Sequence, residues 1–429
     1  MFTAMSLPLV RDAMSQAAQA KPVVDTGDTA WILASAALVM VMTPALGFFY
    51  GGMVRKKNAL STINWSFIIV ALISVQWVLW GYSLAFGPDK GHIIGNLSWF
   101  GLNGVGQEPN ADYAATIPHL AFMIFQAMFA VITPALITGA FAERMKFSSF
   151  LVFILIWATV VYDPVAHWIW GVGGWLRNLG AIDFAGGTVV HIASGVAALA
   201  AAMAMGRRQG YGKEPMEPHN ITMVVLGAGL LWFGWFGFNA GSALGSNGLA
   251  TSAFVVTNTA AGAAALTWMI MSWLFTGKTS ILGIASGAVV GLVAITPASG
   301  YVTPLASIAI GIGAGVFCFL AVRMRSRSRL DDSLDVWGCH GVGGTWGALA
   351  TGLFASKAVN PAGADGLFYG NPVQLWYQFI AVAVVWAFSF SFTWIILKVI
   401  DVTMGLRVKD HEEEMGLDLS QHGEAAYRI

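Results

Sequence analysis

Long apolar runs separated by short polar loops repeat along almost the whole chain. Each run is about as long as a membrane-spanning helix, which needs roughly 20 apolar residues at about 1.5 Å rise per residue. The pattern predicts an all-α membrane protein whose eleven transmembrane helices occupy residues 29–53, 62–87, 119–142, 147–171, 185–206, 220–243, 251–276, 279–298, 302–323, 336–356 and 373–403. Three segments follow from these spans: an N-terminal extension at 1–27, a transmembrane domain at 28–403, and a polar C-terminal tail at 404–429.

Basic residues in the loops between the spans lie almost entirely on one side of the expected membrane. Alternate loops, beginning with the one after the first span, contain Arg55, Lys56, Lys57, Arg144, Lys146, Arg207, Arg208, Lys213, Lys278, Arg323, Arg325, Arg327 and Arg329. The opposite loops contain only Lys90, Arg177 and Lys357. Since Lys and Arg favour cytoplasmic loops, the N-terminus is expected outside and the C-terminus inside. That orientation requires an odd number of spans, which agrees with eleven.

Composition supports many spans rather than one large core. Of the 429 residues, 57% are hydrophobic and only 10% are charged, whereas soluble domains carry about 25% charge. Mean hydropathy is +0.68. The formal net charge is zero, so nothing suggests nucleic-acid binding. The two cysteines, Cys318 and Cys339, lie in apolar stretches without a CxxC pattern, and we interpret them as packing residues.

Both termini leave alternatives open. Ala18-Gln19-Ala20 resembles a signal-peptidase site, but no basic segment or long apolar run precedes it. A cleaved signal and a mobile extension therefore remain equal alternatives for residues 1–27. The tail at 404–429 is acidic, and either a solvated segment or a regulatory, partner-binding segment fits its composition.

Two halves of the chain show traces of a duplication. The first span contains Gly-Phe-Phe-Tyr-Gly-Gly (47–52) and the sixth contains Gly-Trp-Phe-Gly-Phe-Asn-Ala-Gly-Ser (234–242). The fifth and tenth spans each have an Asp upstream, a histidine and a glycine-rich run. Five plus five helices in opposite orientation, with one extra helix, fit an inverted repeat.

The ionisable residues inside spans are the first candidates for function, because they are costly in a membrane. His191 and His340 each lie within a span among Gly and Val residues. A neutral imidazole donates from one nitrogen and accepts at the other, so two such rings can share a proton along a narrow path. The bland alternative is that each histidine only bonds a backbone carbonyl. A bis-histidine haem site is a further, less favoured possibility, and a metal site lacks a third ligand.

Asp183 lies just before the fifth span, in Asp-Phe-Ala-Gly-Gly-Thr-Val-Val-His (183–191). A carboxylate at this place caps free amides at the start of a helix, and we favour that interpretation. Attraction of a cation is the alternative. Asp335 stands similarly before His340.

Aromatic residues gather at the external halves of several spans. Phe125 and Phe129 lie in the third, Trp170 ends the fourth and Phe238 lies in the sixth. Most tryptophans of a membrane protein are interfacial or packing residues. An aromatic cage nevertheless binds small ammonium-type cations, and Ser242, one turn beyond Phe238, offers an oxygen acceptor.

At this point the sequence resembles the ammonium transporter (Amt) family of the Amt/Mep/Rh superfamily, bacterial type. The segment 183–195, continuing to Gly206-Arg207-Arg208, is similar to the family signature. Supporting matches are Gly-Ala-Phe-Ala-Glu-Arg (139–144), Trp-Phe-Gly-Phe-Asn-Ala-Gly-Ser (235–242), Thr-Pro-Ala-Ser-Gly-Tyr (296–301), Asp-Val-Trp-Gly-Cys-His-Gly (335–341), Gly-Leu-Arg-Val (405–408) and His-Gly-Glu-Ala-Ala-Tyr (422–427). The resemblance covers roughly residues 28–427.

The resemblance implies a role for each candidate residue. Phe125, Trp170 and Ser242 match an external ammonium site, with Asp183 as the essential aspartate beside it. Phe129 and Phe238 match a stacked aromatic gate, and His191 and His340 match the twin histidines of the pore. It also implies a homotrimer in the cell inner membrane, whose tail and internal loops bind a PII-type signalling protein. No cofactor, no metal and no enzymatic activity are expected.

The function expected from the residues and the resemblance together is transport of ammonium. The cation binds outside by cation–π contact and loses a proton, ammonia crosses the apolar pore, and the proton follows the histidines, so net transport is electrogenic. The alternative is an ammonium sensor that acts through a PII partner with little flux. A membrane redox enzyme is a third possibility, tied to the haem interpretation of the histidines.

Overall fold

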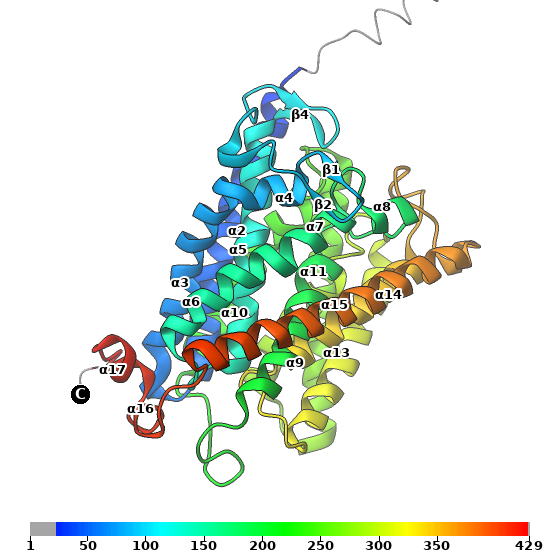
Figure 1. The fold of residues 1–429 in the computed structure, drawn as a ribbon. Coiled ribbons are helices and arrows are strands. Elements are labelled where there is room, and N and C mark those ends of the chain that lie inside the picture. Colours follow the sequence, from blue (N-terminus) through cyan, green and yellow to red (C-terminus); the bar gives the residue numbers. More distant parts are fainter. Residues whose placement is uncertain (1–22, 428–429) are drawn as a thin grey trace, which may run out of the picture.

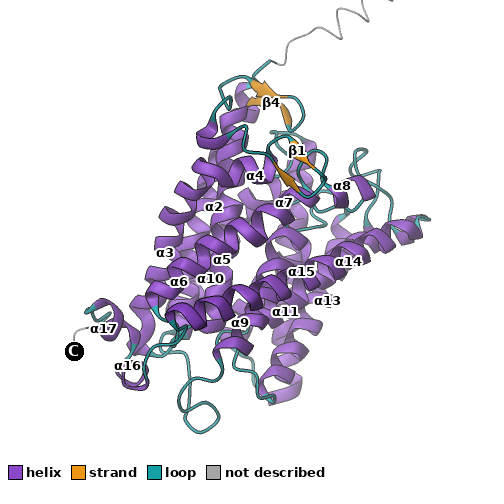
Figure 2. Cartoon of the chain, viewed as in Figure 1, coloured by secondary structure: helices purple, strands orange, loops and turns teal. Residues whose placement is uncertain are grey.

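The computed structural model describes residues 23–427, and long helices dominate it (Figures 1 and 2). Two very short hairpins, β1 (Asp89–Lys90) with β2 (Ile94–Gly95) and β3 (Pro109–Asn110) with β4 (Ala114–Pro118), lie at one end. The long helices are α2 (Thr26–Met53), α3 (Ala59–Gln76), α5 (His119–Phe141), α6 (Phe147–Trp157), α9 (Ala193–Met205), α10 (Ile221–Gly241), α11 (Gly248–Thr276), α12 (Ile281–Ile295), α13 (Pro304–Ser326), α14 (Val342–Phe354) and α15 (Pro372–Met404). The short helices are η1 (Lys56–Asn58), α4 (Tyr82–Phe86), η3 (Phe100–Leu102), α7 (Asp163–Ile169), α8 (Trp175–Leu179), η7 (Leu367–Tyr369), α16 (Asp410–Met415) and α17 (Leu417–His422).

A helix occupies each of the eleven ranges predicted from the apolar runs. Within the described residues, nine continuous helical segments are long and apolar enough to span a membrane. Of the other two, α12 in the glycine-rich run at 279–298 is shorter, and the segment that ends with α14 is not among the nine. Helix α2 begins at Thr26, just inside the predicted N-terminal extension, while the rest of the expectation for 1–27 lies mostly outside the described residues.

Between residues 23 and 427, four helical segments are π-helical, which the apolar pattern did not predict. They are η2 (Trp77–Gly81), η4 (Ala158–Tyr162), η5 (Gly187–Ile192) and η6 (Trp337–Gly341). Each one continues directly into an α-helix, so η2 joins α3 to α4 and η4 joins α6 to α7. Single π-helical turns inside α-helices occur often at functional sites. His191 lies in η5 and His340 lies in η6.

Glycines let α2 and α10 pack closely along most of their length. A Cβ on Gly52 would approach the backbone of Asn220, and one on Gly237 would approach Ser35. Close backbone approach through small residues is the usual way helices associate in lipid, where apolar burial provides no drive. These contacts join the end of α2 to the start of α10, so the two helices run antiparallel.

The fifth and tenth spans form a second antiparallel contact. Gly195 of α9 lies against the backbone of Gly341, and Gly344 of α14 lies against the Cβ of His191. The first span therefore packs on the sixth and the fifth packs on the tenth.

The end of the bundle opposite the hairpins is tied together by ion pairs. Glu143, in the loop after α5, pairs with Arg55 and lies 3.5 Å from Arg208. Arg208 also pairs with Asp331 at 2.8 Å. Burial lowers the pKa of Arg144 to about 10, an effect that Asp331 partly offsets. Loops that are far apart in sequence are thus joined on the side where most basic residues lie.

The C-terminal tail packs on this charged end rather than extending into solvent (Figure 1). The buried carboxylate of Asp418 accepts from the backbone amides of Leu60 and Ser61 at 3.0 and 2.7 Å. Buried Glu413 accepts from the backbone of Gln209 and pairs with Arg407. The tail therefore contacts both the start of α3 and the loop after α9.

Candidate functional site

A cavity of about 660 Å³ opens at the end of the bundle that carries the hairpins. Its wall includes Trp170, Asp183, Ser242, Tyr301 and Phe129. The Trp170 indole donates to the backbone carbonyl of Asp183 at 2.9 Å, which fixes the ring at the mouth of the pore. This cavity brings together four of the residues that the sequence analysis assigned to external binding and gating.

The serine and the two phenylalanines of the third span take different positions around this cavity. The Ser242 hydroxyl donates to the carbonyl of Phe238 at 2.9 Å, so its oxygen remains an acceptor toward the cavity. Phe125 is fully buried and lies behind Phe129, with their ring centroids 5.0 Å apart. Phe129 itself, rather than Phe125, faces the cavity beside Trp170.

Phe129 and Phe238 close the inner end of the cavity. Their ring centroids lie 4.4 Å apart at an interplanar angle of 43°. Both rings are almost completely buried, and Phe129 meets Trp170 edge to face at 5.8 Å. The two rings that the resemblance assigned to a gate therefore lie in contact at this end of the cavity.

The two histidines lie directly beyond these two rings. Nδ1 of His340 is 3.3 Å from Nδ1 of His191, and the rings are stacked at 27° with centroids 5.3 Å apart. His191 also stacks on Phe238, with centroids 6.0 Å apart. The Nε2 atom of His191 is buried, and no described residue forms a hydrogen bond with it. One ring must donate and the other accept, because two N–H groups would oppose each other.

Backbone packing explains why the two rings meet. A Cβ on Gly195 would overlap the backbone nitrogen of Gly341, next to His340. A Cβ on Gly344 would be 3.0 Å from the Cβ of His191. The direct contact between the two Nδ1 atoms differs from a bis-histidine haem site, in which the iron lies between the two rings. Within residues 23–427 there is also no group of three His, Cys, Asp or Glu residues suited to a metal.

Asp183 caps the segment that carries His191, as the favoured sequence interpretation predicted. Oδ1 accepts from the amides of Gly186 and Gly187 at 2.8 and 2.7 Å, and Oδ2 accepts from the amide of Thr188 at 2.7 Å. The Thr188 hydroxyl and the Val189 amide also donate to Oδ2. Both oxygens are thus turned toward η5, although the side chain borders the cavity that Trp170 lines.

The corresponding expectation for Asp335 is wrong. Asp335 pairs with Arg325 at 2.6 Å instead of capping the tenth span. Asp332 is the capping residue, and its Oδ2 accepts from the amide of Trp337 at 2.8 Å. Asp332 precedes His340 by the same interval as Asp183 precedes His191. The sequence points to Asp335 because it is nearer to His340, but spacing alone does not show which of the two carboxylates faces the start of the helix.

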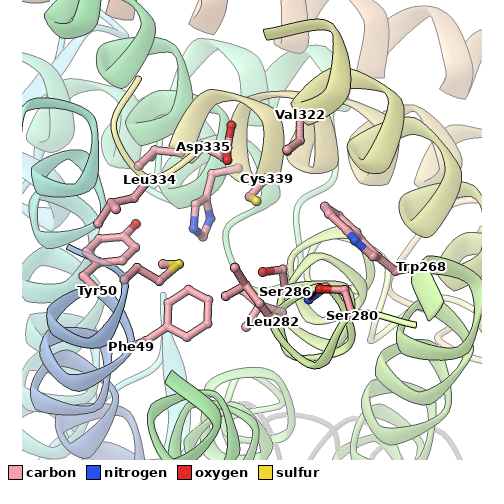
Figure 3. A pocket seen from close by; sticks show the side chains of 15 residues that line it. Phe49, Tyr50, Trp268, Ser280, Leu282, Ser286, Val322, Leu334, Asp335 and Cys339 are labelled. Atoms are coloured by element: carbon pink, nitrogen blue, oxygen red, sulfur yellow. Dashed lines mark hydrogen bonds between the residues drawn. The ribbon is translucent and has the colours of Figure 1, made fainter. Parts of the chain in front are cut away.

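A second cavity, of about 190 Å³, borders His340 and shares no lining residue with the first. Figure 3 shows side chains around it, among them Tyr50, Ser286 and Asp335. His340 lines it, together with Tyr50, Ser286, Asp335 and Cys339. Between the two cavities is only a gap of about 10 Å³, bordered by His191, Phe238 and His340. Two cavities therefore approach an apolar, occluded middle from opposite ends.

Two residues of this path were missed by the sequence analysis. Gln126 lines the cavity beside Trp170 one turn before Phe129, and its buried Oε1 has no hydrogen-bond partner among residues 23–427. Trp235 stacks on His191 at 5.4 Å, while its indole nitrogen donates to Thr296. Gln126 lies three residues before Phe129, and Trp235 lies three residues before Phe238. This helical spacing places each pair on one helix face, and it could have indicated both residues from the sequence.

Comparison with known proteins identifies this arrangement. A model of the Ammonium Transporter Family matches residues 30–427. The chain belongs to the ammonium transporter family. It is 53% identical to the ammonium transporter of Bacillus subtilis, over 94% of this chain and 98% of the relative. It is 52% identical to ammonium transporter Amt1 of Archaeoglobus fulgidus, over 94% and 99%.

The fold is likewise that of solved members of the family. The crystal structure of Candida albicans Mep2 is 42% identical, with a TM-score of 0.87 over 94% of this chain and 91% of that one. The protein is therefore a multi-pass membrane transporter for ammonium and not an enzyme. The predicted family and helical membrane fold are confirmed.

Proposed function

We propose that this transporter binds ammonium in the external cavity, removes a proton, and passes ammonia and the proton separately to the opposite side. The observation that carries the proposal is the order of the parts. A wide cavity, an aromatic barrier, a pair of histidines in contact and a second cavity follow one another.

External binding rests on the π face of Trp170 and the oxygen of Ser242. A cation over an indole ring gains about 0.5–2 kcal/mol, depending on how far it is desolvated. The Trp170 ring is held by its bond to Asp183, and Phe129 forms the floor below it. Phe125 supports that floor from behind, while the hydroxyl of Ser242 accepts a hydrogen bond from the cation. A potassium ion has no such hydrogen to donate.

Deprotonation follows from the barrier below this site. Carrying a charge to the centre of a membrane costs several kcal/mol, and the gap beside the histidines is nearly closed and apolar. Ammonia carries no charge, so it needs only a brief opening of Phe129 and Phe238. The stacked histidines provide a separate route for the proton, because their Nδ1 atoms already share a hydrogen-bonding position.

The test is electrical current in proteoliposomes after addition of ammonium, with potassium as the comparison ion. Wild type is expected to give a current with ammonium and none with potassium. The matched variants are His191→Ala, His340→Ala and the double change, with Thr279→Ala, at an exposed position in the loop before α12, as a control. If wild type gives no current, transport is not electrogenic. If the double variant still excludes potassium and gives an unchanged ammonium current, the proton does not travel along the histidines.

The larger assembly expected from the sequence also belongs to this proposal. The antiparallel contacts of α2 with α10 and of α9 with the tenth span support a five-plus-five inverted repeat with α15 as the extra helix. The N-terminus lies outside and the C-terminus inside, with the ion-paired loops facing the cytoplasm. Three such chains form a homotrimer in the cytoplasmic membrane, with one pore in each subunit. In this proposal residues 28–403 form the transmembrane domain and residues 404–429 form the cytoplasmic tail.

A PII-type protein binds the cytoplasmic face in this proposal. The tail at 404–429 packs against loops of that face through Glu413 and Asp418, so a partner there contacts tail and loops together. Deletion of 404–429 is expected to weaken binding of a purified PII protein at least tenfold, which corresponds to about 1.4 kcal/mol. Unchanged binding after the deletion contradicts a role for the tail.

An ammonium sensor with little flux is the second candidate, and a particular similarity favours keeping it. The structure described as a sensor Amt protein has a TM-score of 0.84 and 30% identity, and the alignment covers 92% of this chain and 98% of that one. Growth of a transport-deficient strain on low ammonium separates the two functions. Restored growth supports transport, whereas binding of ammonium without restored growth supports sensing.

A further inference from the structure

A buried acid lies inside the bundle at a position that the transport path does not use. Asp163 begins α7 directly after the π-helical segment η4, and its side chain is fully inaccessible. It lines none of the cavities described above. Ionisable residues buried within membrane spans are costly, and a partner or a function normally accounts for them.

The partner of Asp163 is an amide rather than a base. Gln76, the last residue of α3, donates from Nε2 to Oδ2 of Asp163 at 2.9 Å. No Lys, Arg or His among residues 23–427 forms an ion pair with Asp163. His167, one turn further along α7, is engaged by Asp89 and by the carbonyl of Ala85. An ionised Asp163 would therefore be a buried charge without a counter-ion, which is far more costly than a neutral acid.

The hydrogen-bond inventory supports the same conclusion. Three buried atoms here have no hydrogen-bond partner in the described part of the chain: Oδ1 of Asp163, Oε1 of Gln76 and the hydroxyl of Tyr162. If Asp163 is ionised, its Oδ1 and the amide oxygen are both acceptors and neither can satisfy the other. If Oδ1 carries a proton, it becomes a donor for Gln76 Oε1. One proton thus removes both the charge and two of the three unpaired atoms.

We propose that Asp163 is a neutral carboxylic acid that forms a two-point hydrogen-bonded pair with the Gln76 amide, and that this pair positions α7 against α3. In the pair, Gln76 Nε2 donates to Asp163 Oδ2, and the protonated Oδ1 donates to Gln76 Oε1. Helix α7 ends immediately before Trp170, so the pair is a positioning element for the external site. The pairing itself is independent of the transport mechanism, whereas its effect on Trp170 rests on the proposed function.

The surrounding backbone leaves a space that suits the Gln76 amide. Gln76 immediately precedes η2, and Gly81 ends that π-helical segment. A Cβ on Gly81 would lie 2.5 Å from Gln76 Oε1 and 2.7 Å from Nε2. The side chain of Gln76 therefore folds over a glycine, where any larger residue would displace it. A substitution at Gly81 thus disturbs the pair while all ionisable groups remain unchanged.

Infrared spectroscopy tests the charge state without any transport measurement. The difference spectrum of wild type minus Asp163→Asn, recorded in lipid at neutral and mildly alkaline pH, is expected to contain a carboxylic acid C=O band from wild type. Appearance of a carboxylate band instead overturns the proposal. Loss of the acid band on addition of ammonium or potassium chloride also overturns it, because the site would then bind a cation.

Two further variants test the pairing and its positioning role. Gly81→Ala is expected to shift the acid band and to raise the ammonium concentration for half-maximal uptake about fivefold, the equivalent of roughly 1 kcal/mol, with little change in maximal rate. Gly229→Ala is the matched control, because a Cβ there meets nothing within 4 Å. Asp163→Asn, which can form an amide–amide pair with Gln76, is expected to retain the wild-type uptake curve, whereas Asp163→Leu is not.

The outcomes separate this proposal from the proposed function. An acid band that is unaffected by Gly81→Ala contradicts the pair with Gln76. A shifted band with wild-type half-saturation contradicts the positioning role alone. If wild type gives no uptake at all, the proposed function fails while the infrared result still decides the state of Asp163.

Discussion

Removal of the Asp183 cap is the most direct test of how this pore is held together. Five donors converge on the two carboxylate oxygens: the amides of residues 186–189 and the hydroxyl of Thr188. In Asp183→Asn the new amide group must turn its nitrogen toward one of the two sets of donors. The smaller set consists of Gly186 and Gly187, so at least two charge-assisted hydrogen bonds are lost.

The expected cost follows from these two bonds. A hydrogen bond to a charged group contributes about 1.5–3 kcal/mol, so two of them correspond to roughly 3 kcal/mol after water from the external cavity has replaced part of the loss. That is about a hundredfold in the local opening equilibrium. Because η5 carries His191, the contact with His340 is expected to loosen as well, and ammonium-dependent current falls with it.

Hydrogen exchange of the four amides at 186–189 measures this cost directly, since exchange there reports local opening. We expect exchange in Asp183→Asn to be about a hundredfold faster, with distant helices such as α11 unchanged as an internal control. Asp183→Glu keeps the charge but places it one methylene too far, so it is also expected to lose function. The capping argument is refuted if exchange in Asp183→Asn equals that of wild type and the Asp183→Glu variant is active. That result would favour attraction of the cation.

Three further changes have expected outcomes. Trp170→Leu removes the cation–π surface, about 0.5–2 kcal/mol, so half-maximal uptake should require roughly 2- to 30-fold more ammonium, and an unchanged uptake curve contradicts cation binding at this ring. Gly195→Ala forces α9 away from Gly341, so it should destroy the histidine contact and the current, and wild-type current would show that the close approach is dispensable. Burial against Phe147 lowers the pKa of His422 below its usual 6.5, an effect that Asp418 and Glu424 partly offset. His422 in the docked tail thus binds a proton more weakly than in a free tail. Docking is therefore complete above pH 6.5 and weakens as the pH falls below that value. Protease sensitivity of the tail should rise on acidification in wild type but not in His422→Gln.

Several parts of the site were accessible from sequence because they depend on residue type and local spacing. The charge asymmetry of the loops, the apolar spans and the motifs around His191 and His340 are such features, and the family was confirmed from them. The cap by Asp183 was also predictable, because a carboxylate just before a glycine-rich helix start has few other roles.

Other parts depended on which faces of the helices meet. The choice of Asp332 over Asp335, the place of Phe125 behind Phe129, and the pair of Gln76 with Asp163 were not visible in the sequence. In a soluble protein a polar stripe marks the outer face of each helix and thereby indicates the buried one. In a membrane both lipid and neighbouring helices are apolar, so no such stripe exists.

The sequence by itself determined that this protein is a helical membrane protein of a known family, and which residues are candidates for its pore. Only the tertiary structure decided that the two histidine rings touch and that an aromatic pair closes the path above them. Length and hydropathy are properties of each segment alone, whereas contact between rings depends on close glycine packing such as that of Gly195 on Gly341, which neither property encodes.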